Sequence, residues 1–269
     1  MSDFRNPMSD LHDEFNPKKI DVLAAVRESY SGAWNHLGEM LRLIWLPGLL
    51  YLALNVTGAM LADEGHDVIR LLIEMATLFL WPIIAVAWHR FILLGETPVG
   101  TYQINFGQRE ARFLMVSFFL VLLMLPGFFI ATMTAGLQDM GPSASLVGFA
   151  GILLAFVGIY FLIRLLLLLP AVAIDEPINA RFILERTRGN FWRLVALCVL
   201  SSLPLLAAYW LIMYVFVVAN LPLFIPLFLS SLLSIFFAIV NVAILSIAFR
   251  ELIGPPGTVA ANLDRPDTL

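Results

Sequence analysis

The sequence predicts an all-α polytopic membrane protein whose six transmembrane helices form three hairpins. Of its 269 residues, 60% are hydrophobic and 13% are charged, whereas a soluble domain is about half apolar and about a quarter charged. The apolar residues also form six long runs, and a helix needs about 20 such residues to cross a bilayer. The composition excludes a soluble enzyme and a disordered protein, and a net charge of −4 excludes a nucleic-acid binder.

The six runs are expected to be helices, because a spanning segment must satisfy its own backbone hydrogen bonds in lipid. No run shows the alternation of a barrel strand. Residues 20–253 form the transmembrane domain, between a disordered acidic cytoplasmic tail at 1–19, with no cleavable signal peptide, and a flexible cytoplasmic tail at 254–269. The approximate spans are 43–62, 71–94, 113–135, 145–169, 194–218 and 225–249.

Two segments before spans are predicted to be amphipathic helices in the membrane interface. The first has Asp21 as its N-cap and an apolar residue every three or four positions. The second precedes the fifth span, between Pro177 and Gly189. The apolar stripe of the first is Ile20, Leu23, Val26, Tyr30, Trp34, Leu37 and Leu41.

The basic residues predict the orientation of the chain. With the N-terminus inside, every one of the 16 Lys and Arg residues except Arg70 falls on the cytoplasmic side, as the positive-inside rule requires. Bases near the second interfacial helix either anchor the helix ends or form a platform that contacts anionic head groups. This basic platform consists of Arg181, Arg186, Arg188 and Arg193.

Three arginines recur near the cytoplasmic ends of the even spans: Arg90, Arg164 and Arg250. There are two explanations for the regular spacing of these arginines. Either a two-span unit repeats about an axis along the membrane normal, or bilayer thickness and the positive-inside rule alone produce it. Arg164 lies inside a long apolar run, so it either snorkels to the inner head groups or joins the other two in one cleft. Such a cleft would bind a lipid phosphate, with Asp175 or Glu176 as counter-charge.

Other polar and small residues in the spans have two interpretations each. Glu74 either pairs with Arg70 one turn away or couples transport to a cation. Asn241 either bonds a neighbouring helix or lines a polar path with Asn55 and Thr132. A stripe of small residues in the fourth span predicts close helix packing. The stripe is Ala144, Gly148, Gly151, Ala155 and Gly158.

Three stretches resemble a known group: AWHRFILLGE at 87–96, LPAVAID at 169–175 and RTRGNFWR at 186–193. They resemble uncharacterised proteobacterial six-span proteins, a group similar to the membrane domain fused to some bacterial glycerophosphodiester phosphodiesterases. The resemblance covers about 20–253 and implies a bundle in the bacterial inner membrane with both termini cytoplasmic. The catalytic barrel of the fused proteins has no counterpart here, so the resemblance implies no activity.

No enzyme, cofactor or metal is expected. The four histidines are scattered, Cys198 is the single cysteine, and no catalytic or phosphate-loop motif occurs. A dyad of Ser246 and His89 would have no third orienting group. We therefore expect a non-catalytic inner-membrane protein that binds anionic lipid head groups or a membrane-protein partner at its cytoplasmic face. The alternative is a small transporter or lipid-translocating protein, which needs a continuous polar path.

Overall fold

The computed structural model describes residues 18–61, 67–96, 106–135, 142–220, 222 and 224–263, so the predicted N-terminal tail lies outside the described residues up to position 17. The described chain is all-helical, as predicted. Five helices are long and apolar enough to cross a membrane, or six if the bent pair α3–α4 is one span. The helices are α2 Val22–Asn35, α3 Leu37–Leu43, α4 Trp45–Leu61, α5 Asp67–Leu94, α6 Gln108–Leu122, α7 Leu125–Ala135, α8 Pro142–Leu165, α9 Leu168–Ala173, α10 Ala180–Arg186, α11 Phe191–Ala219, α12 Phe224–Leu252 and α13 Thr258–Leu263.

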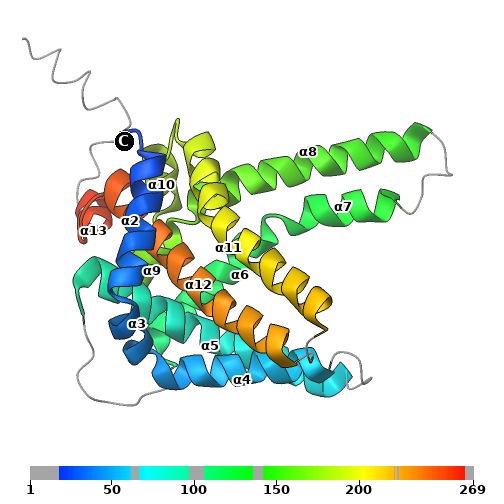
Figure 1. Cartoon of the computed structure of the whole chain (residues 1–269). Coiled ribbons are helices and arrows are strands. Elements are labelled where there is room, and N and C mark those ends of the chain that lie inside the picture. The colour runs from blue at the N-terminus through cyan, green and yellow to red at the C-terminus, as the bar shows by residue number, and fades with distance from the viewer. Residues whose placement is uncertain are drawn as a thin grey trace, which may run out of the picture.

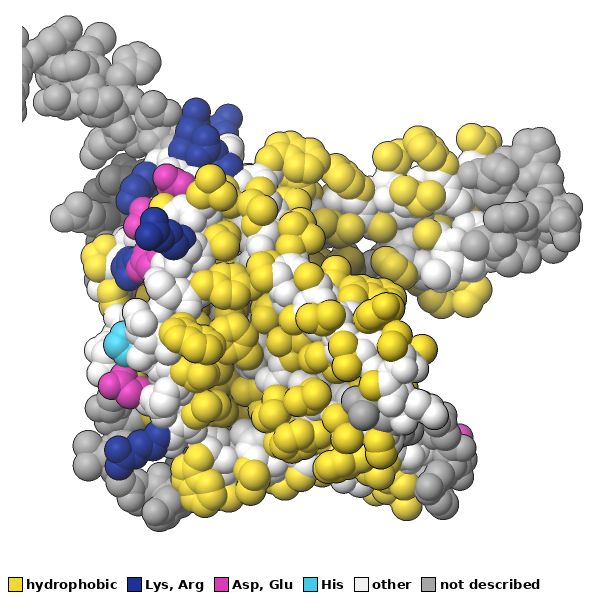
Figure 2. Space-filling model, viewed as in Figure 1, with side chains coloured by type: hydrophobic (Ala, Val, Ile, Leu, Met, Phe, Trp, Pro, Cys, Tyr) yellow, Lys and Arg dark blue, Asp and Glu magenta, His cyan; other side chains and the backbone are white. Residues whose placement is uncertain are grey.

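The long helices converge at one end of the molecule and diverge toward the other (Figure 1). Consecutive helices pack in pairs, α4 on α5, α7 on α8 and α11 on α12. The buried core is concentrated at the convergent end, where α9 packs among α5, α6 and α12. The short helices lie at this end too, and the charged side chains visible in Figure 2 gather there, while the rest of that face is mainly hydrophobic. We call this end the polar end.

Helix α2 lies across the polar end, packed against α11 and α12. Asp21 is its N-cap, as predicted, because its carboxylate accepts a backbone N–H of the first turn. Leu23 and Trp34, two residues of the predicted interfacial stripe, are each 72% exposed. The buried face includes Ala25 and Ala33 instead. Small residues face the core because they allow the helix to approach its neighbours closely.

The first predicted span begins at a bend rather than in a straight helix. The axes of Leu37–Leu43 and Trp45–Gly58 differ by 83°. Pro47 lies in the first turn of α4, where its missing N–H breaks no helical hydrogen bond. The buried indole of Trp88 donates to the carbonyl oxygen of Met40 at 3.1 Å, which ties α3 to α5.

Helices α7 and α8 touch backbone to backbone, which confirms the close packing predicted from the small residues of the fourth span. A Cβ atom on Gly151 would lie 2.7 Å from the backbone nitrogen of Ala131. The facing glycine on α7, Gly127, was not part of the prediction, and its Cβ would lie 2.1 Å from the backbone nitrogen of Ala155. This pair projects away from the other helices (Figure 1).

The segment after α12 is folded, whereas the sequence predicts a flexible tail from residue 254. The carboxylate of Glu176, which is 4% exposed, accepts the backbone N–H groups of Gly257 and Ala260 at the start of α13. The first N–H groups of a helix lack partners within it, and a carboxylate there is stabilising. Val259 is fully buried beside this contact. Residues 264–269 of the predicted tail lie outside the described part.

Candidate functional site

The candidate site is built around Asp175, at the end of α9. The helix closes with a Schellman motif, in which the backbone N–H of Glu176 donates to Ala171 at 2.9 Å and that of Asp175 donates to Val172 at 3.2 Å. This motif requires a left-handed residue, and Asp175 fills that place with a φ of 64°. Glycine is usual there, although aspartate tolerates the conformation. The turn therefore fixes the position of a carboxylate at the polar end.

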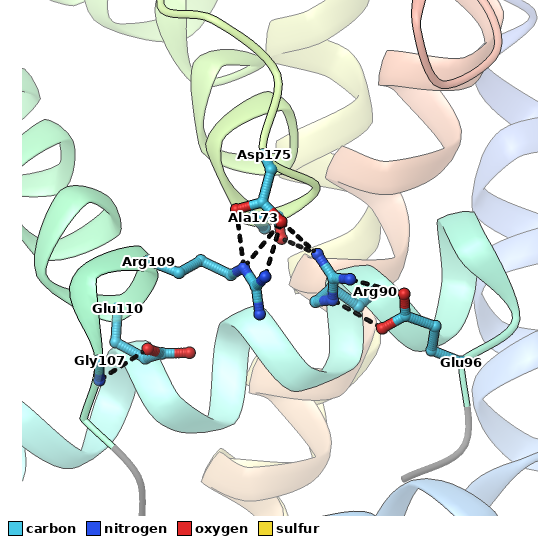
Figure 3. Close-up of polar contacts among 7 residues, drawn as sticks. All are labelled: Arg90, Glu96, Gly107, Arg109, Glu110, Ala173 and Asp175. Carbon is cyan, nitrogen blue, oxygen red and sulfur yellow. Dashed lines mark hydrogen bonds and ion pairs between the residues drawn. The ribbon is translucent and has the colours of Figure 1, made fainter.

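Two arginines from different helices meet on this carboxylate (Figure 3). Arg109, in the first turn of α6, donates through Nε at 2.8 Å and through Nη2 at 2.7 Å. Arg90, near the end of α5, donates through Nη1 at 2.9 Å and also contacts the carbonyl oxygen of Ala173. The rest of the Arg90 guanidinium forms a two-pronged pair with Glu96, at 2.7 and 2.6 Å. These contacts join α5, α6 and the α9 turn.

The four charged groups of this network balance each other. Hydrogen bonds from Arg109 lower the pKa of the Asp175 carboxyl below its ordinary value, and the positive charges of Arg109 and Arg90 act in the same direction, against the effect of burial. Asp175 is therefore ionised at neutral pH. Two guanidinium groups and two carboxylates leave no net charge, so the network itself is a weak attractor for an anion.

Beside the network is a pocket of about 400 Å³, which opens at the start of α6. The Glu110 carboxylate accepts the backbone N–H of Gly107 at 2.9 Å, which is one half of a capping box. The side chain of Arg112 has no hydrogen bond or ion pair with any described residue. The lining residues are Gly107, Gln108, Arg109, Glu110, Arg112 and Asp175. The pocket is thus lined by positive and negative side chains and by the side-chain amide of Gln108.

Arg164 does not reach the predicted cleft and does not snorkel. Its side chain is 8% exposed. The guanidinium donates to the hydroxyl groups of Tyr160 at 2.8 Å and Thr187 at 3.1 Å, and to the carbonyl oxygen of Leu184. The chain turns back after α9, and this brings α10 over the end of α8. Arg164 is therefore an interhelical link between α8 and α10, which neither sequence interpretation anticipated.

The predicted single cleft of three arginines is wrong, because each arginine has different partners. Arg250 is exposed, and its Nη2 pairs with Glu28 on α2 at 2.5 Å. Of the three, Arg90 alone contacts Asp175 among the described residues. Arg90 therefore has the predicted counter-charge, whereas Arg164 contacts α10 and Arg250 contacts α2.

The members of the basic platform differ in their contacts. Arg181 pairs with Glu185 at 3.1 Å, one turn away on α10. Arg186 lies over the ring of Phe182, 5.3 Å from its centroid. Arg188 is exposed, and its side chain has no hydrogen-bond or ion-pair partner among the described residues. Arg193 donates to the carbonyl oxygen of Ile20 at 2.7 Å, so it also holds the segment before α2.

Sequence reasoning missed Arg109 and Glu96, which complete the network around Asp175. The Gly107-to-Glu110 spacing of the capping box could have located the start of α6 at Gln108, four positions before Arg112. That start would have placed Arg109 in the first turn, beside the polar end. Its contact with Asp175, however, depends on the turn after α9.

His89 and Ser246 do form a buried pair, but the direction of their hydrogen bond is not that of a catalytic dyad. The His89 Nδ1 atom lies 2.8 Å from the Ser246 hydroxyl oxygen, and both residues are nearly fully buried. Ser246 donates its own proton to the carbonyl oxygen of Val242 at 2.8 Å. The hydroxyl therefore accepts from His89, the reverse of what an activated nucleophile requires.

Metal binding is likewise unsupported in the described part of the chain, where no group of three His, Cys, Asp or Glu side chains is arranged to hold an ion.

Comparison with protein-family models, with curated proteins and with solved structures gives no match to this chain. The geometry of the polar end is thus the basis on which a function is proposed.

Proposed function

We propose that this chain is a non-catalytic integral protein of a bacterial inner membrane, with six spans in three hairpins and both termini in the cytoplasm, and that its polar end binds anionic lipid head groups. One observation carries the proposal: three platform arginines, Arg186, Arg188 and Arg193, have no carboxylate partner among the described residues. Beside them, Trp192 is 70% exposed. Arginine next to exposed tryptophan is typical of the head-group layer of a membrane.

The alternative of a transporter has less support, because the polar groups that would line a path bond to their own helices. Asn241 donates to a backbone carbonyl four residues earlier at 2.8 Å, which replaces the predicted interhelical bond. Asn55 and Thr132 do the same at 2.8 and 2.9 Å. Glu74, the candidate coupling carboxylate, pairs with Arg70 at 3.4 Å on the exposed surface of α5.

The platform is tested by Arg186→Gln combined with Arg188→Gln. Each base near a membrane surface contributes about 1 kcal/mol of attraction to anionic lipid. We therefore expect the double variant to lose about 2 kcal/mol, roughly a thirtyfold weaker retention of phosphatidylglycerol. Retention is measured by native mass spectrometry of the full chain in detergent.

The matched control is Arg181→Gln combined with Glu185→Gln. Arg181 differs from the other platform arginines because its charge is already paired with Glu185, so this variant removes an ion pair from α10 without changing the net charge. Its phosphatidylglycerol retention should equal that of the wild type. Equal retention by the Arg186/Arg188 double variant would contradict the proposal.

A further inference from the structure

The pocket at the start of α6 has the chemistry of a zwitterion site rather than an anion site. Its ionisable side chains are two arginines, Arg109 and Arg112, and two carboxylates, Glu110 and Asp175. A ligand with a single negative charge would meet both carboxylates, and a cation would meet both arginines. A ligand with one charge of each sign can pair with both sets, and charge-assisted hydrogen bonds of this kind are the strong ones.

Within the pocket, one basic and one acidic side chain each have hydrogen-bonding positions left for a ligand. Arg112 is without a partner in the described chain, so its guanidinium can accept a phosphate in the two-pronged geometry that arginine favours. Glu110 has one carboxylate oxygen on the Gly107 N–H, which leaves the other oxygen to accept hydrogen bonds. A primary ammonium has three N–H donors for such acceptors, whereas a quaternary ammonium has none.

A strip of apolar side chains continues from the pocket along α6. Met115, Phe119 and Leu122 follow Arg112 at intervals of three, four and three residues, which places all four on one face of the helix. Their side chains are 60%, 60% and 39% exposed. Acyl chains below a bound head group would lie against this strip, so the observations favour a lipid over a free polar metabolite.

We propose that the pocket lined by Glu110, Arg112 and Asp175 binds the head group of a zwitterionic phospholipid with a primary ammonium, of the phosphatidylethanolamine class. Arg112 and the first turn of α6 hold the phosphate. Glu110, assisted by Asp175, accepts the ammonium. The inference rests on the proposed membrane location, but it does not involve the anionic-lipid platform.

The experiment measures the ratio of phosphatidylethanolamine to phosphatidylcholine that the full chain retains from an equimolar mixture, by native mass spectrometry. Neither lipid has a net charge, so binding of anionic lipid at the platform does not affect the ratio. We expect a preference for phosphatidylethanolamine of about tenfold, which is about 1.4 kcal/mol. A wild-type ratio near one would overturn the inference and leave the proposed function intact.

The decisive variant is Glu110→Gln, because glutamine also serves in a capping box and the start of α6 is preserved. The ratio should fall by about tenfold. The control Glu185→Gln removes an exposed carboxylate outside the pocket and should leave the ratio unchanged. An equal fall in both variants would refute the site.

A second variant tests the phosphate partner. Arg112→Gln should lower the retention of both lipids while their ratio stays the same. Soluble glycerophosphoethanolamine is the last probe, and at millimolar concentration it should not displace the lipid, because it lacks acyl chains for the α6 strip. Displacement at that concentration would show that a free metabolite is the ligand and would overturn the lipid assignment.

Discussion

A Gly127→Ala substitution is expected to destabilise the protein by about 1–3 kcal/mol, the usual cost of overpacking a close contact. The added Cβ would lie 2.1 Å from the backbone nitrogen and 2.5 Å from the Cα atom of Ala155. Backbone atoms cannot rotate aside as a side chain can, so α7 must move away from α8. That movement would also loosen the contact of Gly151 with Ala131. The free energy of unfolding in mixed detergent–SDS micelles, followed by tryptophan fluorescence, measures the loss.

Gly32→Ala is the matched control, because it makes the same chemical change in another helix. No atom lies within 4 Å of a Cβ built on Gly32 in α2. Alanine is favoured over glycine inside a helix by about 0.5–1 kcal/mol, so this variant should be more stable than the wild type. Opposite signs for the two substitutions are the expected result. If Gly127→Ala left the free energy of unfolding unchanged or raised it, α7 and α8 would not be in backbone contact at this position.

The features that the sequence predicts well are local ones. Asp21 caps α2, Arg70 pairs with Glu74, and the glycines of the fourth span face a close neighbour, because each of these follows from the spacing of residues along one helix. The long apolar helices are likewise visible as composition. In all these cases the period of the α-helix alone determines which side chains are adjacent.

Contacts between distant segments were not predictable in the same way. The meeting of Arg109 with Asp175 depends on the turn after α9, where an aspartate adopts a conformation usual for glycine. Hydrophobic periodicity also did not show which face of α2 contacts the other helices, because the predicted apolar stripe was assigned to the membrane interface and not to the protein core. Close packing against two helices selects small residues for the buried face, so the largest apolar side chains of α2 point outward.

Arg164→Lys is expected to destabilise the protein by about 2 kcal/mol or more, although it preserves the charge. The guanidinium of Arg164 donates from three nitrogens to three oxygen atoms on two elements, those of Tyr160 on α8 and of Leu184 and Thr187 at α10. Lysine presents its donors from a single nitrogen and cannot reproduce the planar fork. Hydrogen bonds to charged groups contribute about 1.5–3 kcal/mol each, and the carbonyl oxygen of Leu184 would lose its charged donor.

This substitution separates an interhelical link from a snorkelling side chain. A snorkelling arginine only needs a long stem and a charge, so lysine would replace it with little change in stability. The control is Arg188→Lys, on the exposed surface near the end of α10, which should be neutral in the same unfolding measurement. A neutral Arg164→Lys would mean that Arg164 does not hold α10 to α8. A large loss for Arg164→Lys beside a neutral Arg188→Lys would show that the geometry of the guanidinium, and not its charge, joins the two helices.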